Sequence, residues 1–165
     1  MILFPNELTS LPALSVRQPW ASYLSSGLKT MELRSWSTRY RGWLWIHAGK
    51  KLDLDAVDML HLSVDEFSRG GLLGLAKLED CLTLEYEEQW LRLRGEHLSP
   101  GWYSGPCFGW QFSDALALAE IIECPGELGL FHLSHDIAGR VSREIEKTDH
   151  HEFVKFACEA LAHLP

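Results

Sequence analysis

The feature that most restricts the fold of this chain is an early alternation of short extended runs with residues that end them. Residues 13–17 (ALSVR) have the pattern of a short strand, and Gln18-Pro19 follows directly. Because proline suits the first position of a helix, residues 20–26 are expected to form a short helix, which the following glycine closes. Arg41-Gly42 then marks a turn before a bulky strand at residues 43–48. The alternation favours short strands with small helices between them.

The rest of the chain continues this alternation. Further strands are expected at residues 29–33, 72–84, 108–112, 115–122 and 128–133. Amphipathic helices are expected at residues 54–62, 85–95 and 148–164. Together these segments predict a mixed α+β fold, a small β-barrel decorated by helices, with an added C-terminal helix.

A length of 165 residues suits one domain with short additions, and 46% hydrophobic with 23% charged residues excludes wholesale disorder. Residues 1–12 are expected to form an N-terminal extension and residues 13–133 the domain. Residues 134–147 are polar and are expected to link the domain to the C-terminal amphipathic helix, so that residues 134–165 form a separate addition.

The N-terminal residues have no basic region before an apolar stretch, and Pro5, Asn6 and Glu7 interrupt them, so no signal peptide is expected. No apolar run approaches the roughly 18–20 residues that cross a bilayer, so no membrane partner is expected. The expected location is the cytoplasm, or the nucleus if the source is a eukaryote. The cysteines form no CxxC pair and are expected to be reduced: Cys81, Cys107, Cys124 and Cys158.

Charge is distributed unevenly along the chain, whose formal net charge is −8. Residues 1–52 carry seven basic and two acidic side chains, a net +5, and the remaining residues carry a net −13. A basic segment on an acidic chain can form a local anion-binding surface, because short-range fields decide contacts at physiological salt. The alternative is that these cations are dispersed and solvated.

The common motifs for nucleotides, metalloproteases and serine hydrolases are absent from the sequence, and no cofactor is expected. His132 and His135 are three residues apart, and His150 and His151 are adjacent. No cysteine or carboxylate cluster completes a metal site around them, so no metal site is predicted.

Four residues close together in sequence, Gly27, Lys29, Glu32 and Arg34, carry the functional argument. Glycine allows a tight turn from helix to strand, and lysine presents a mobile ammonium to a phosphate, carbonyl or carboxylate. Glutamate can accept hydrogen bonds from an exocyclic amine of a base, and it lies on the same side of a strand as the arginine two residues later. The alternative is an ion network on the surface that contributes little stability.

This GxKxxExR pattern, with Gln18-Pro19-Trp20-Ala21 before it and Tyr40-Arg41-Gly42 after it, resembles the activating signal cointegrator homology (ASCH) domain of the PUA-like superfamily. The later segment FGWQFSDALALAEIIECPGELGLFHL resembles the closing strands of that family, so the resemblance covers residues 13–133. The resemblance implies a ligand site around the motif. In eukaryotes such domains occur within transcription coactivators, so the resemblance implies that this chain is homologous to part of such a coactivator.

Neighbouring residues extend the expected ligand site. Exposed tryptophans would stack on bases, and Trp20 and Trp36 are the candidates; Trp43 and Trp45 are expected in the core. Cations nearby are expected to contact phosphates: Arg39, Arg41, Lys50 and Lys51. His47 either borders the site or is a hydrogen-bonded core histidine.

Two function classes follow. The resemblance implies a nucleic-acid-binding module whose partner is RNA, other single-stranded nucleic acid or a modified nucleoside. The alternative is a small hydrolase, an amidohydrolase on acetylated cytidine or a ribonuclease, with Lys29 and Glu32 as catalytic residues. In the amidohydrolase subfamily a threonine stands three residues after the lysine, whereas this chain has Glu32 there. A protein-interaction module is a third possibility that no specific feature supports.

Overall fold

The computed structural model describes residues 4–147. Its strands are β1 (Pro12–Gln18), β2 (Met31–Arg34), β3 (Gly42–Leu52), β4 (Gly71–Leu84), β5 (Cys107–Glu123) and β6 (Leu130–His132). Its helices are α1 (Phe4–Ser10), α2 (Trp20–Ser25), α3 (Leu54–Met59), the 3-10 turn η1 (Val64–Glu66), α4 (Glu87–Arg92), α5 (Arg94–His97) and α6 (His135–Lys147). None of the helices in this part of the chain is both long and apolar enough to span a membrane.

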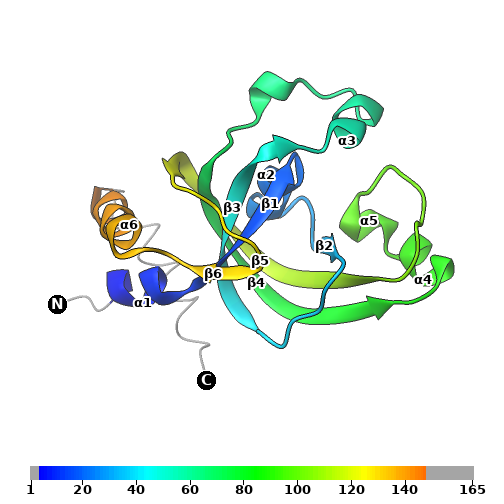
Figure 1. Cartoon of the computed structure of the whole chain (residues 1–165), viewed down its shortest axis with the longest axis horizontal. Helices are drawn as coiled ribbons and strands as arrows, with labels where there is room; N and C mark the ends of the chain where they lie inside the picture. The colour runs from blue at the N-terminus through cyan, green and yellow to red at the C-terminus, as the bar shows by residue number, and fades with distance from the viewer. Residues whose placement is uncertain (1–3, 148–165) are drawn as a thin grey trace.

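The six strands form one sheet in the order β2-β5-β4-β3-β1-β6 (Figure 1). All neighbouring pairs are antiparallel except β1 and β3, which run parallel. The predicted α+β class is therefore confirmed. The barrel is only partly formed, because β2 pairs with β5 alone and β6 pairs with β1 alone, so the sheet does not close.

The segments expected as two strands, residues 108–112 and 115–122, form the single strand β5. Its partner β4 aligns Lys77 with Asp114 and Leu78 with Phe112, which leaves Ser113 as an extra residue between them. This is a β-bulge, which bends a strand without ending its ladder of hydrogen bonds. The polar pair after Phe112 thus marks a bend in the sheet and not a loop.

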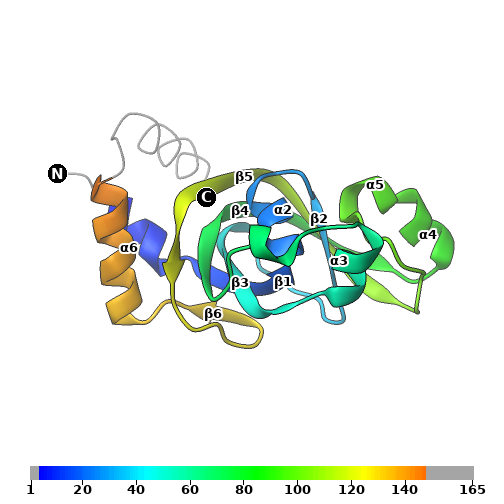
Figure 2. The same ribbon diagram turned by 90° about the horizontal axis from the view of Figure 1, so that it is seen from above.

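The segment at residues 134–147, expected to link the domain to a C-terminal helix, contains a helix that the sequence pattern did not predict. Residues 135–147 form α6, which packs beside α1 at one end of the molecule, as both views show (Figures 1 and 2). Ile137 and Val141 are buried in one hydrophobic cluster with Leu8 and Leu11. The predicted helix at residues 148–164 lies outside the described residues.

Two further hydrophobic clusters pack against the sheet. One lies between α2 and the inner face of the sheet and includes Leu24, Leu44 and Trp110; the other lies beneath α4 and includes Met31 and Trp90. Trp43 and Trp45 are buried, as expected. Cys124 is buried, and Cys81 and Cys107 are partly buried; all three are free thiols. Cys158 lies outside the described residues.

Candidate functional site

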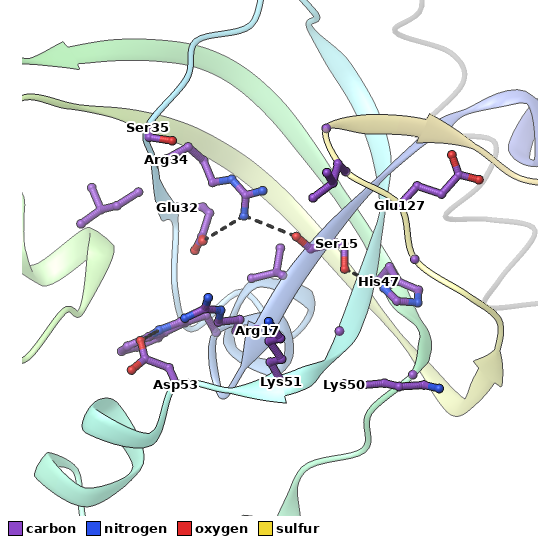
Figure 3. A pocket seen from close by; sticks show the side chains of 18 of the residues that line it. Ser15, Arg17, Glu32, Arg34, Ser35, His47, Lys50, Lys51, Asp53 and Glu127 are labelled. Carbon is purple, nitrogen blue, oxygen red and sulfur yellow. Dashed lines mark hydrogen bonds and ion pairs between the residues drawn. The ribbon is translucent and has the colours of Figure 1, made fainter.

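A cavity of about 990 Å³ lies at the opening of the sheet, where β1 and β2 both line it without pairing (Figure 3). Its walls come from β1, β2, the second half of β3 and the loop at residues 124–129. Arg34 of β2 bridges this opening, because its Nη1 donates a hydrogen bond to the carbonyl of Ser15 in β1 at 3.3 Å. A side chain thus spans the place where a closed barrel would have a ladder of backbone bonds.

Gly27 forms the turn that brings the motif to the cavity. Its φ of +78° lies in the left-handed region, which glycine adopts without strain, and its N–H bonds the carbonyl of Leu24 at the end of α2. The Lys29 N–H then bonds the carbonyl of Tyr23. Gly27 does not line the cavity, so its role is to set the path of the chain.

Lys29 lies in the cavity wall with only 3% of its surface exposed. Its ammonium donates to the carbonyl of His97 in α5, lies 4.6 Å from the centre of the Trp20 ring, and is 3.6 Å from Glu32 Oε2. Burial lowers the pKa of Lys29, while the carboxylates of Glu32 and Asp53 oppose that shift. The lysine is therefore fixed in place before any ligand arrives.

Glu32 is 6% exposed and stands between two cations. Its Oε2 is 3.6 Å from Lys29 Nζ, and its Oε1 is 3.8 Å from Arg34 Nη1. Both distances exceed that of a hydrogen bond. Burial raises the pKa of Glu32, and the Lys29 and Arg34 charges oppose that shift. The predicted trio is thus brought together as one charged cluster in the cavity.

Trp20 lines the cavity but is buried, so it offers little face to a base. Its Nε1 donates to Asp53 Oδ2 at 2.8 Å, and Asp53 Oδ1 caps α3 by accepting from the N–H of Ala56. Sequence analysis missed Asp53. Its position directly before a helical pattern is the signal that would have identified it as a cap.

Trp36 is the more accessible aromatic group. It is partly exposed, lines the cavity, and lies 5.6 Å from the Arg34 guanidinium. Its carbonyl accepts from Trp110 Nε1, and the two rings meet edge to face at 4.6 Å. One tryptophan of the predicted pair is therefore suited to contact a ligand.

His47 meets both expectations, since it lines the cavity and is also a buried, hydrogen-bonded residue. Its Nε2 lies 2.9 Å from the carbonyl of Cys124, which only accepts, so Nε2 carries the proton and Nδ1 accepts from the Ser15 hydroxyl at 3.0 Å. Burial lowers the pKa of His47, with the bond to Cys124 opposing the shift. The imidazole supports the cavity wall and the loop above it.

The cations at the cavity differ from those expected. Arg17, Lys50 and Lys51 are exposed and line it (Figure 3), and of these Arg17 was not predicted. Arg39 and Arg41 do not line it. Arg41 instead pairs with Asp80 of β4 at 3.0 Å, because the chain turns away from the cavity after β2.

Ser15, Ser99 and the loop at residues 124–129 also line the cavity and were not predicted; Ser99 and the loop lie far from the motif along the chain. No three side chains that bind metals gather within the part of the chain that the structure describes. The cavity therefore combines exposed cations, one accessible indole and a charged trio of which Lys29 and Glu32 are buried and Arg34 is partly exposed. Such a set can hold an anion and a planar polar group side by side.

Comparison with known proteins identifies the family of this chain and solved structures with a similar fold. A protein-family model of the ASCH domain matches residues 14–125. Activating signal cointegrator 1 of Homo sapiens is 40% identical over 100 residues, and that of Mus musculus is 39% identical over 89 residues. These matches cover 53% and 46% of this chain but only 17% and 15% of the relatives, so the chain spans less than a fifth of their length.

Among solved structures, ASCH from Zymomonas mobilis is similar, with a TM-score of 0.59 and 14% identity over 82% of this chain and 95% of that one. A single-residue variant of that protein has a TM-score of 0.58, also at 14% identity, over 81% and 97% of the two chains. At this identity the likeness concerns the fold.

Proposed function

The chain belongs to the ASCH domain family, and from that premise we propose that it binds single-stranded RNA or a nucleotide-like ligand in the cavity between β1 and β2. The observation that carries the proposal is the grouping of exposed cations beside the charged trio Lys29, Glu32 and Arg34 in one cavity. The net charge of the chain is −8, so this positive grouping is local.

The cavity offers separate places for the parts of a nucleotide. Arg17, Lys50 and Lys51 make no ion pair with any residue in the described part of the chain, so they are available to a phosphate. Trp36 presents an aromatic face beside Arg34. The volume of about 990 Å³ is at the upper end of the roughly 300–1,000 Å³ typical of ligand sites, which supports a ligand larger than a base alone.

The test is fluorescence anisotropy of a labelled single-stranded RNA at two salt concentrations. For the double variant Lys50→Ala, Lys51→Ala, binding should depend less on salt. The slope of log affinity against log salt should become shallower by about 0.7 for each cation removed. The separate variant Lys29→Ala should also weaken binding of the RNA. The control is Arg92→Ala, because Arg92 is an exposed cation that pairs with Glu88 outside the cavity. Equal slopes in the double variant and the control would contradict the proposal.

A small hydrolase is a second candidate, and one observation favours it. Lys29 and Glu32 lie 3.6 Å apart in the cavity wall, and burial shifts the pKa of each toward its neutral form. Such a pair can polarise a carbonyl and activate a water. Incubation with N4-acetylcytidine and with RNA, followed by mass spectrometry, tests this candidate. Product that Glu32→Gln abolishes would establish an enzyme, and binding without product would leave the binding module.

A further inference from the structure

Glu32 lies between two cations, and the distances of both ion pairs are longer than an ordinary hydrogen bond. Its side chain is more than nine-tenths buried and lines the cavity, and its only contacts to cations are the ion pairs at 3.6 and 3.8 Å. A carboxylate held in a cavity wall by ion pairs of this length keeps lone pairs for further donors, so it is suited to accept hydrogen bonds from a ligand.

The groups around this carboxylate stand in a fixed order. Lys29 lies nearest Oε2 and Arg34 lies nearest Oε1. The hydrogen-bonding groups along the cavity wall are therefore ordered donor, acceptor, acceptor, donor. Each neighbour is also held by a backbone carbonyl, since Lys29 donates to the carbonyl of His97 and Arg34 Nη1 donates to the carbonyl of Ser15. The order is therefore built into the protein.

We propose that this cluster reads guanine as the base of the bound RNA. Along its Watson–Crick edge guanine presents the O6 acceptor, the N1–H donor and the N2 amino donor, with N3 as an acceptor beyond them. The two donors match the Glu32 oxygens, and the acceptors on either side match Lys29 and Arg34.

The other bases do not match this order. Adenine and cytosine each place a ring-nitrogen acceptor beside one amino group, and uracil places its N3–H between two carbonyl oxygens. Each would bring an acceptor lone pair against a carboxylate oxygen, which repels it. Guanine alone among the four presents two adjacent donors.

This inference rests on the proposed RNA binding, and the experiment separates the two. The probes are short labelled oligouridylates that carry one central guanosine, inosine, adenosine or cytidine. Inosine differs from guanosine only in lacking the N2 amino group, so it removes one donor to Glu32. The wild-type protein should bind the guanosine probe about tenfold more tightly than the inosine probe, and adenosine and cytidine more weakly still.

Three outcomes are distinct. A clear preference for guanosine over inosine supports the inference. Equal binding of all probes overturns it and leaves RNA binding intact. Binding of none of the probes overturns both proposals. These comparisons use the wild-type protein, so they do not depend on how a variant folds.

The variant Glu32→Gln gives a second readout. An amide offers one acceptor and one donor in place of two acceptors, so the preference for guanosine over adenosine should fall about tenfold or more. The control is Glu88→Gln, which removes an exposed carboxylate on α4 outside the cavity and should keep the preference. An unchanged preference in folded Glu32→Gln would overturn the role assigned to Glu32.

Discussion

At the scale of single residues, Gly126 determines how closely the loop before β6 approaches the cavity wall. A Cβ atom at this position would lie 2.5 Å from Cε1 and 2.7 Å from Nδ1 of the His47 ring, and 3.0 Å from the Ser15 hydroxyl. The imidazole is held by hydrogen bonds on both nitrogens, so it cannot turn aside without losing one. The loop can lie here only because residue 126 has no side chain.

The variant Gly126→Ala should therefore lower the free energy of unfolding by about 1–3 kcal/mol, because the loop must move away from the ring. The matched control is Gly95→Ala in α5, where a Cβ would meet no atom within 4 Å. Alanine favours a helix over glycine by up to about 1 kcal/mol, so the control should be neutral or stabilising. Urea unfolding measures both, and a Gly126→Ala protein as stable as the control would show that the loop packs differently.

His47 should also give the protein a pH dependence. Burial lowers its pKa below the ordinary 6.5, so between that lowered pKa and 6.5 the unfolded chain binds more protons than the folded one. The contribution of His47 to stability is thus complete above pH 6.5 and is lost as the pH falls. In the variant His47→Gln, the free energy of unfolding should fall less between about pH 7.5 and about pH 5 than in the wild type.

The buried His97 keeps its own lowered pKa in this variant, so a smaller slope should remain. The control is His132→Gln, which removes an exposed imidazole. Urea unfolding across this pH range checks the result. A slope in His47→Gln equal to that of the wild type would mean that the His47 ring does not resist protonation in the fold.

At the scale of elements, α6 and α1 depend on each other. Val141 is fully buried, and it shares a cluster with Leu8 and Leu11 at the end of the sheet. Trp45 belongs to the same cluster and donates its indole N–H to the carbonyl of Leu8. The N-terminal helix is thus tied to the sheet by a hydrogen bond and covered by α6.

The variant Val141→Ala should lower the free energy of unfolding by about 1–2 kcal/mol, because two buried methyl groups are lost and the cavity they leave cannot close fully. Ser142→Ala, a neighbouring and less buried position, is the control and should change stability little. Guanidinium unfolding compares the two. Equal stabilities would show that α6 is not part of the cooperative unit.

The same elements show where sequence patterns suffice. The strands were predicted because alternating or continuous apolar residues cover most of β1, β3 and β4. α6 was missed because most of its residues are polar, and its buried face rests on the pair Ile137 and Val141. The packing of this face against α1, and not the helix propensity of the segment, decides that it is helical.

At the scale of the whole molecule, the site could be predicted only where one segment supplies it. Lys29, Glu32 and Arg34 come from residues 29–34, and local geometry brings them together. Arg17, Asp53 and the loop at residues 124–129 reach the cavity through the pairing of β1 with β3 and β6, which no local pattern reveals. Proximity in sequence was misleading for Arg41, which pairs with β4 instead.

The strand order has a consequence for how the chain is made. Of the six described strands β1 is made before the others, yet its parallel partner β3 begins at Gly42 and its other neighbour β6 begins at Leu130. Contacts this distant in sequence form slowly, so during synthesis the apolar side chains of β1 are exposed before their partner strands are made. Until β6 has been made, this exposed apolar surface is a place where the nascent chain can aggregate.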